Sequence, residues 1–295
     1  MGAGSWTAKA YTNAMDARGF STAFNASTNS AVMNFTNVNA SQYYVARKLD
    51  EVLNPYKVIR ECRDNAEHPN TIPVLLGLDI TGSMGKASVA CAAKLNEIIT
   101  LLYEKVRDVE FLTCAIGDLS YDNAPFQVSQ FESDIRILDQ LDKVYFEGGG
   151  GGNGFESYTL PWFFGLHQTK LDCWNRGQKG IIITLGDEPL NPYLPKKPLI
   201  KTLGCSIEAN VDTKQLYEEA SKKFDIYHLA IDDPDSSYDY HKDAIHKTWG
   251  ALLGDNFMVA NLNNLSQTIS KIITTSAASI GSGTGITVGE NGISW

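Results

Sequence analysis

Long apolar runs alternate along the chain with stretches whose apolar residues recur every three or four positions, a pattern typical of α/β proteins. The run from Ile72 to Leu78 is almost unbroken and stops at Asp79. Such runs are typical of parallel strands buried on both faces. Further strands are predicted at 108–117, 180–186, 225–231 and 257–260, with a short antiparallel edge strand at 126–128. We therefore expect a mostly parallel central sheet with helices on both faces.

The helical pattern is clearest after the first strand, where apolar residues of 86–107 fall on one face. Further helices are predicted at 41–54, 131–141, 160–166, 212–224, 239–253 and 262–278, and the basic, proline-containing stretch 195–210 is expected to be a solvated loop. These elements define one α/β domain at 71–278. Residues 1–70 are expected to form an N-terminal arm and lead-in, irregular up to about residue 40, and 279–295 a glycine-rich C-terminal tail.

Charge and cysteine usage exclude several classes of protein. The net charge is −9 and no basic run occurs, which argues against nucleic-acid binding. The five cysteines are widely spaced without a C-x-x-C pair, which favours reduced thiols over a zinc or disulfide framework. No signal pattern and no apolar run of ~18–20 residues is present. The sequence thus predicts a cytoplasmic protein with no membrane association.

Oxygen-bearing side chains follow the predicted strands. Asp79, Thr81 and Ser83 come at the end of the first strand, and Asp187 follows the strand at 180–186. The carboxyl ends of parallel strands meet at one edge of a sheet, where ligands of open α/β sheets bind, and Asp118 is expected at the same edge. Carboxylates and hydroxyls suit hard divalent cations. Alternatively, Asp79 caps the next helix and the hydroxyls bond turn amides.

A run of five glycines at 148–152 precedes a third group of oxygen-bearing residues. Such a run costs backbone entropy on folding, so it indicates either close backbone approach to a ligand or a flexible surface loop. The candidate ligands after it are Asn153, Glu156 and Ser157. Register after the glycines favours Asn153, then Glu156, and a Glu156 ligand would add one negative charge to the site.

The segment 79–85, DITGSMG, resembles the first segment of the metal-ion-dependent adhesion site of von Willebrand factor A domains, usually D-x-S-x-S, with Thr81 in place of the first serine. Asp187 matches the third segment, whereas the loop at 153–157 lacks the threonine of the second. The resemblance is to intracellular prokaryotic or phage members and covers roughly 73–278. It implies a Rossmann-like three-layer fold and a Mg²⁺ or Mn²⁺ site whose ligands are Asp79, Thr81, Ser83, Asn153 or Glu156, and Asp187.

The resemblance also implies a function without catalysis. In such a module, an Asp or Glu of a partner protein binds the metal, and intracellular relatives commonly work beside AAA+ ATPases or in larger assemblies. One alternative is a structural or assembly protein with a degenerate metal site, which the missing threonine favours. Another is a phosphotransferase similar to haloacid dehalogenases, with Asp79 as nucleophile. That class needs an acidic residue where this chain has Thr81.

Overall fold

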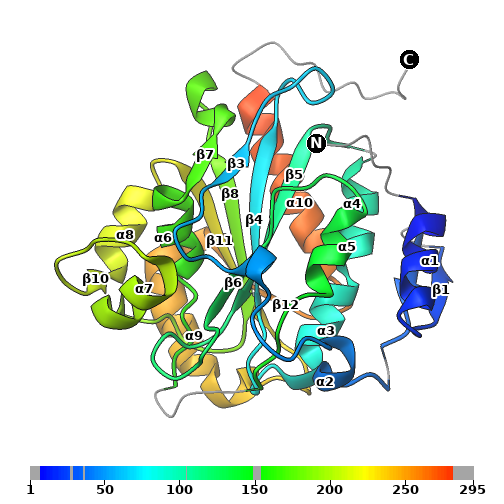
Figure 1. Ribbon diagram of the computed structural model, residues 1–295, viewed down its shortest axis with the longest axis horizontal. Helices are drawn as coiled ribbons and strands as arrows, with labels where there is room; N and C mark the ends of the chain where they lie inside the picture. The colour runs from blue at the N-terminus through cyan, green and yellow to red at the C-terminus, as the bar shows by residue number, and fades with distance from the viewer. Residues whose placement is uncertain (1–6, 27–28, 36, 104, 149–153, 282–295) are drawn as a thin grey trace.

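The computed structural model describes residues 7–26, 29–35, 37–103, 105–148 and 154–281. Its centre is a six-stranded sheet in the order β12-β11-β8-β4-β5-β6 (Figure 1). The strands are β4 (Ile72–Asp79), β5 (Val109–Ile116), β6 (Phe126–Val128), β8 (Gly180–Gly186), β11 (Phe224–Ile231) and β12 (Phe257–Ala260). Every pair in this sheet is parallel except β5–β6, so the predicted sheet with its antiparallel edge strand is confirmed.

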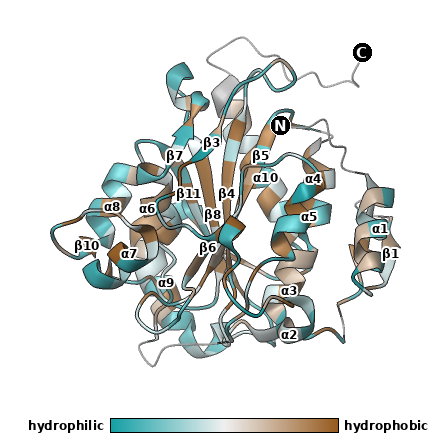
Figure 2. Cartoon of the chain, viewed as in Figure 1, coloured by the Kyte–Doolittle hydropathy of each residue, from teal (hydrophilic) through white to brown (hydrophobic). Residues whose placement is uncertain are grey.

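Helices cover both faces of the sheet. One face carries α3 (Gly85–Ala93), α4 (Leu95–Tyr103), α5 (Arg136–Leu141) and α10 (Leu265–Gly281), and the other carries α6 (Leu160–His167), α8 (Thr213–Ala220) and α9 (Tyr238–Leu253) (Figure 1). Because successive side chains of a strand point to opposite faces, Leu76 and Leu78 join one apolar cluster and Leu75 the other. Figure 2 shows the strands as the most hydrophobic part of the chain.

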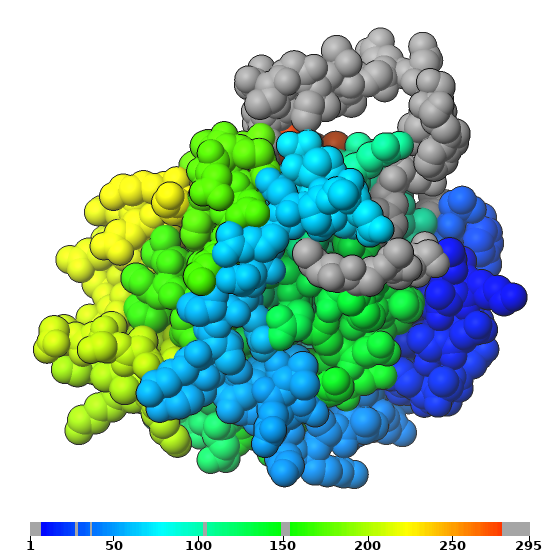
Figure 3. Space-filling model, turned by 45° about the horizontal axis from the view of Figure 1, so that its top comes forward, coloured from blue at the N-terminus to red at the C-terminus, as the bar shows by residue number. Residues whose placement is uncertain are grey.

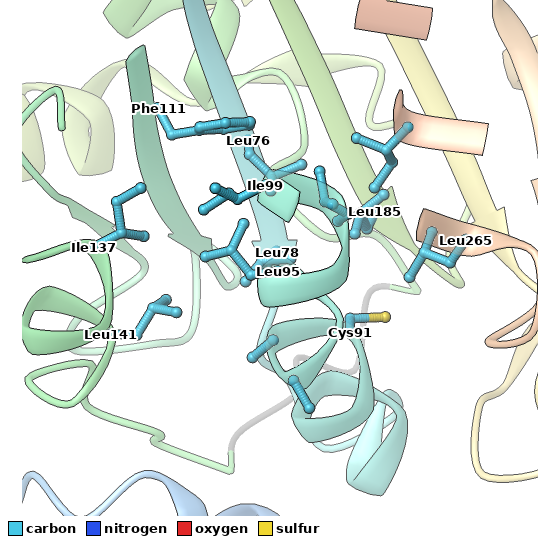
Figure 4. Packing of buried hydrophobic residues seen from close by; sticks show 14 of the residues in the cluster. Leu76, Leu78, Cys91, Leu95, Ile99, Phe111, Ile137, Leu141, Leu185 and Leu265 are labelled. Atoms are coloured by element: carbon cyan, nitrogen blue, oxygen red, sulfur yellow. The ribbon is translucent and has the colours of Figure 1, made fainter. Parts of the chain in front are cut away.

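The first apolar cluster lies between β4, β5 and the paired helices α3 and α4. Leu76 and Leu78 of β4 point toward Leu95 and Ile99 of α4, and Phe111 of β5 lies beside them (Figure 4). The single helix predicted at 86–107 is therefore two helices, which a turn at Lys94 separates. Both helices contribute buried residues to this cluster.

Two other expectations on this part of the chain need correction. The stretch 195–210 is not simply a loop, because it contains α7 (Lys196–Leu203), whose Leu199 and Leu203 are buried. Its proline lies in the first turn, where a missing backbone N–H costs no helical hydrogen bond. The helix predicted at 131–141 covers only 136–141. Residue 132 instead forms an isolated β-bridge with β5.

The N-terminal arm is more regular than its sequence indicates. It contains α1 (Ala8–Ala17), a hairpin of β1 (Thr22–Asn25) and β2 (Ser30–Met33), and the short helix α2 (Ala40–Tyr43). The helix predicted at 41–54 is limited to α2 and the 3₁₀ turn Glu51–Leu53. Tyr11 and Met15 are buried in the first apolar cluster, beside the helices of the α/β domain. The arm therefore packs on the α/β domain, as Figure 3 shows at the side of the molecule.

The lead-in crosses the surface and joins the domain through short strands. Residues 41–70 run along one face in Figure 3, and β3 (Arg60–Cys62) pairs in parallel with β7 (Thr169–Leu171). A further small pair joins β9 (Tyr193–Leu194) to β10 (Val211–Asp212). All five cysteines are free thiols. Among the described residues, no helix has the length and apolar character needed to span a membrane.

The buried carboxylate of Glu97 joins the N-terminal arm to the helices α4 and α10. Glu97 of α4 is 2% exposed, and its Oε1 accepts a hydrogen bond from Asn25 Nδ2 at 2.8 Å. Its Oε2 accepts bonds from Lys94 Nζ and from Ser266 Oγ of α10, each at 2.8 Å. These donors lower the pKa of Glu97 against the effect of burial. The carboxylate thus holds three segments together in its ionised form.

Candidate metal centre

Two aspartates lie together at the carboxyl edge of the sheet. Asp79 is the last residue of β4, and Asp187 comes directly after β8. Leu78 of β4 is paired with Leu185 of β8, so the two aspartates lie at neighbouring strand ends. Both are 0% exposed. The predicted convergence of these two strand ends is therefore present in the structure.

Four oxygen-bearing side chains form one connected chain at this edge. Asp79 Oδ1 accepts hydrogen bonds from the Thr81 hydroxyl at 2.6 Å and from the Thr81 amide at 2.8 Å. The hydroxyls of Thr81 and Ser83 are 3.0 Å apart, and Ser83 Oγ donates to Asp187 Oδ1 at 3.1 Å. Four of the six predicted ligands are thus in contact with one another.

This spacing fits a magnesium ion. Oxygens at adjacent corners of a Mg²⁺ octahedron lie about 2.9 Å apart, because each is about 2.05 Å from the metal. The contacts between Thr81 and Ser83, and between Ser83 and Asp187, are 3.0 and 3.1 Å. Ser83 is half-buried and Gly82 is exposed, so the chain of oxygens reaches the surface at this turn. Two carboxylates and two hydroxyls there match the oxygen ligands that Mg²⁺ prefers.

Tyr158, a residue that the sequence analysis did not select, connects the two aspartates. Its buried hydroxyl donates a short hydrogen bond to Asp79 Oδ2. The same oxygen accepts bonds from the amides of Asp187 and Glu188, at 3.2 and 3.3 Å. A side chain at Gly186 would collide with this ring, since its Cβ would lie 2.2 Å from the Tyr158 oxygen. The absence of a side chain at Gly186 is the local sequence signal for this contact.

The loop after β11 supplies a further contact that sequence reasoning missed. The amide of Ser237 donates to Asp187 Oδ2 at 2.6 Å, while Ser83 donates to the other oxygen of the same carboxylate. Beside it, His241 Nε2 lies 3.2 Å from Glu188 Oε1. Asp187 is therefore held from two sides, by the turn after β4 and by the loop after β11.

The site concentrates buried negative charge. Burial and repulsion from Asp187 raise the pKa of Asp79 to about 7. Burial also raises the pKa of Asp187, and burial together with repulsion from both aspartates raises the pKa of Glu188 to about 8. A divalent cation would offset this repulsion, so the charge balance and the oxygen spacing both fit a metal ion.

The remaining predicted ligands do not belong to this set of four hydrogen-bonded side chains. Asn153 lies outside the described residues. Glu156 is 5% exposed, and burial with repulsion from Asp79 and nearby acids raises its pKa to about 10. No hydrogen bond joins Glu156 to the four connected side chains, and its Oε2 has no hydrogen-bond partner among the described residues. Asp118 does lie at this edge after β5, and its Oδ1 accepts from the Ser120 amide of its own loop.

No cluster of three or more His, Cys, Asp or Glu side chains with metal-binding geometry occurs among the described residues. The candidate centre differs from such a cluster, because two of its four side chains, Thr81 and Ser83, carry hydroxyl groups. It therefore depends on Thr81 and Ser83 as much as on the carboxylates.

Comparison with known proteins supports the fold. No family model and no curated protein sequence matches this chain. Among solved structures, the PilB minor pilin from Streptococcus sanguinis matches with a TM-score of 0.50 and 12% identity, over 76% of this chain and 65% of that chain. The pilus adhesin SpaC from Lactobacillus rhamnosus GG matches with a TM-score of 0.49 and 11% identity, over 76% of this chain and 31% of that chain.

The vWF domain of the type V pili tip protein Mfa5 from Porphyromonas gingivalis also matches, with a TM-score of 0.45 and 12% identity, over 71% of this chain and 96% of that domain. The chain thus spans less than two thirds of the two pilus proteins and nearly all of the isolated domain. The chain shares with the PilB minor pilin a mixed α/β architecture, which in this chain is a mostly parallel sheet between helical layers.

Proposed function

We propose that this chain is a protein-binding module that depends on Mg²⁺ or Mn²⁺. Asp79, Thr81, Ser83 and Asp187 would hold the ion, and an Asp or Glu side chain of a partner protein would complete its shell. The observation that supports this most is the connected chain of four side-chain oxygens, which begins in the core at Asp79 and reaches the surface at Ser83. The bound ion would supply the positive charge that attracts the partner's carboxylate.

The geometry favours binding over catalysis. Asp79 is 0% exposed, and both its oxygens already accept hydrogen bonds from Thr81 and Tyr158. A phosphotransferase of the haloacid dehalogenase type also needs an acidic residue where this chain has Thr81. We propose that the chain is not an enzyme and acts in the cytoplasm, where an AAA+ ATPase or a larger assembly would supply the acidic partner. The sequence adds Asn153 as a proposed fifth ligand.

Calorimetric titration of the metal-free protein with Mg²⁺ and with Mn²⁺ tests the metal site. We expect one saturable site, which Ser83→Ala weakens at least tenfold and Asp79→Asn abolishes. Asp225→Ala is the matched control, because Asp225 lies at the amino end of β11, at the opposite edge of the sheet, and pairs with Lys179. Absence of saturable heat at millimolar metal would refute the proposal.

A second function has one observation in its favour. The oxygens of the site bond to one another, to Tyr158 and to Ser237, so the network is satisfied without an ion. A structural or assembly protein with a degenerate site would show this arrangement. In that case metal would change neither the melting temperature nor any partner complex, whereas the metal-dependent module predicts that EDTA dissociates the complex and Mg²⁺ restores it.

A further inference from the structure

A pocket of about 510 Å³ opens where the lead-in, the loop after β5 and helix α7 meet. Figure 3 shows the lead-in beside α7, and the amide of Lys57 donates to the Leu203 carbonyl at 2.9 Å. The pocket volume lies within the range of about 300–1,000 Å³ that is typical of ligand sites. None of the four side chains of the candidate metal centre lines it. The pocket is therefore a separate feature of this surface.

The lining of the pocket offers accessible apolar and aromatic surface. Tyr56 and Tyr121 are 47% and 59% exposed, and Leu49 and Pro198 are half-buried. Tyrosine combines a large apolar ring with a polar tip, and it is enriched at protein interfaces. This part of the lining is therefore suited to contact with an apolar side chain.

Positive charge lies on the α7 side of the pocket. Lys197 and Lys201 are four residues apart on this helix, so they share one of its faces, and both are exposed and line the pocket. Neither forms an ion pair with another residue of the described ranges. Nζ of Lys57 lies 5.4 Å from the centroid of the Tyr56 ring. Three lysines thus lie in or beside this pocket, in a chain whose net charge is −9.

The nearby carboxylates already have backbone donors. Asp122 is the acidic residue of the lining in the part of the chain that the structure describes, and its Oδ2 accepts the Asp118 amide at 2.8 Å. Burial raises the pKa of Asp122, which further reduces its negative charge. Oε2 of Glu147 accepts the amides of Asn123 and Ala124, at 2.9 and 3.0 Å. The two lysines of α7 therefore stay available for carboxylates from outside the chain.

The form of the cationic groups favours a peptide over a small anion. Phosphate-sized ligands are typically held by fixed donors, such as backbone N–H groups at a helix N-terminus or bidentate arginines. The cations of this pocket are instead exposed lysine side chains, which are flexible point charges. An extended chain gains from several such contacts at once, because its apolar and acidic side chains meet different parts of the lining.

We propose that this pocket binds an extended acidic segment of a partner protein. An apolar side chain of the segment packs against Tyr56 and Tyr121, and its carboxylates lie beside Lys197 and Lys201. The contact needs no metal ion, so the proposal goes beyond the proposed function and does not depend on it. It gives the chain a second surface for protein recognition, which selects its partner by negative charge.

Titration with a synthetic peptide tests the pocket apart from the metal centre. The probe acetyl-EELLEE-amide is added to ¹⁵N-labelled full-length protein in EDTA, and amide shifts within 119–126 and 197–202 are followed by NMR. The matched probe acetyl-QQLLQQ-amide carries the same apolar pair without the charges. We expect saturable shifts with the acidic peptide and at least fivefold weaker binding of the neutral peptide, because only the acidic one pairs with the lysines.

Matched variants test the two parts of the lining. The double substitution Lys197→Gln with Lys201→Gln should weaken binding of the acidic peptide at least fivefold and leave the neutral peptide unchanged. Lys214→Gln with Lys222→Gln removes the same charge from exposed positions in and after α8, and it should change the affinity less than twofold. Tyr121→Ala should weaken both peptides, because it removes apolar contact area. A thermal melt of each variant shows whether it is folded.

The outcomes separate this proposal from the proposed function. Peptide binding that persists in Asp79→Asn supports the pocket assignment, whether or not the metal site exists. Absence of saturable shifts at millimolar acidic peptide, equal binding of the two peptides, or unchanged binding in the folded lysine double variant would overturn the assignment. Saturable shifts of the same amides with inorganic phosphate alone would also overturn it, because they would indicate a small-anion site.

Discussion

The hydroxyl of Tyr158 joins the two strand ends of the candidate metal centre, and its removal tests the geometry of the site directly. Tyr158→Phe deletes one hydrogen bond to the Asp79 carboxylate and leaves the amides of Asp187 and Glu188 without their acceptor. A hydrogen bond to a charged group contributes about 1.5–3 kcal/mol, and an unsatisfied buried amide costs about 1–3 kcal/mol.

We add the contribution of the bond to Asp79 and the cost of the two amides, and we expect the total to lie at the lower end of these ranges. The two amide contacts are long, 3.2 and 3.3 Å, and share one oxygen, so we assign them about 1 kcal/mol together. With about 2 kcal/mol for the bond to Asp79, the free energy of unfolding falls by about 3 kcal/mol. A domain of this size loses roughly 2–4 °C in melting temperature per kcal/mol, so the shift is roughly 6–12 °C.

The assay is a thermal melt of the metal-free protein, followed by circular dichroism. Tyr240→Phe is the matched control, because Tyr240 is 87% exposed and its hydroxyl has no buried partner to lose. If Tyr158→Phe melts within about 2 °C of the parent protein, the bridge between the two strand ends contributes far less than this geometry requires.

Three further predictions concern the same edge. Gly186→Ala should lower the melting temperature at least as much as Tyr158→Phe, because the new Cβ would lie 2.2 Å from the Tyr158 oxygen, and equal stability in a melt would contradict that contact. Raising the pH through about 7 should remove the stability that protonated Asp79 gives the metal-free protein, since its folded pKa lies above its unfolded value, and Mg²⁺ affinity should rise over the same interval. Calorimetry at pH 6, 7 and 8 measures this, and a flat profile would show that proton loss is not linked to metal binding. Asn153→Ala should weaken Mg²⁺ binding while Glu156→Ala has little effect, and the reverse order in the same titration would make Glu156 the loop ligand.

The centre of the sheet was predictable because β4 and β8 are almost entirely apolar. The strand at 180–186 has the same bounds in the sequence and in the structure, and β4 ends at Asp79 as expected. Burial on both faces favours apolar residues, and the apolar run of each of these two strands ends at a charged residue, Asp79 or Asp187. The same rule placed Asp79 and Asp187 at one edge.

Other elements depend on contacts that the local sequence does not reveal. The helices of the arm and α7 are short and follow from burial of a few residues, such as Tyr11, Met15 and Leu199, against distant parts of the chain. Isolated helices of this length are marginal, so tertiary packing decides whether they form. The approach of Tyr158 and Ser237 to the aspartates was equally hidden, because it requires the segment before α6 and the loop after β11 to reach the same edge of the sheet.

The carboxylate of Glu97 has a consequence for the order of folding. It joins Asn25, 72 positions earlier, to Ser266, 169 positions later. During synthesis the hairpin and α4 emerge long before α10, so Ser266 is the last donor to reach the carboxylate. Contacts this distant in sequence slow folding because a large loop must close first. Until then the face of α4 that packs against α10 in the folded protein stays exposed to solvent.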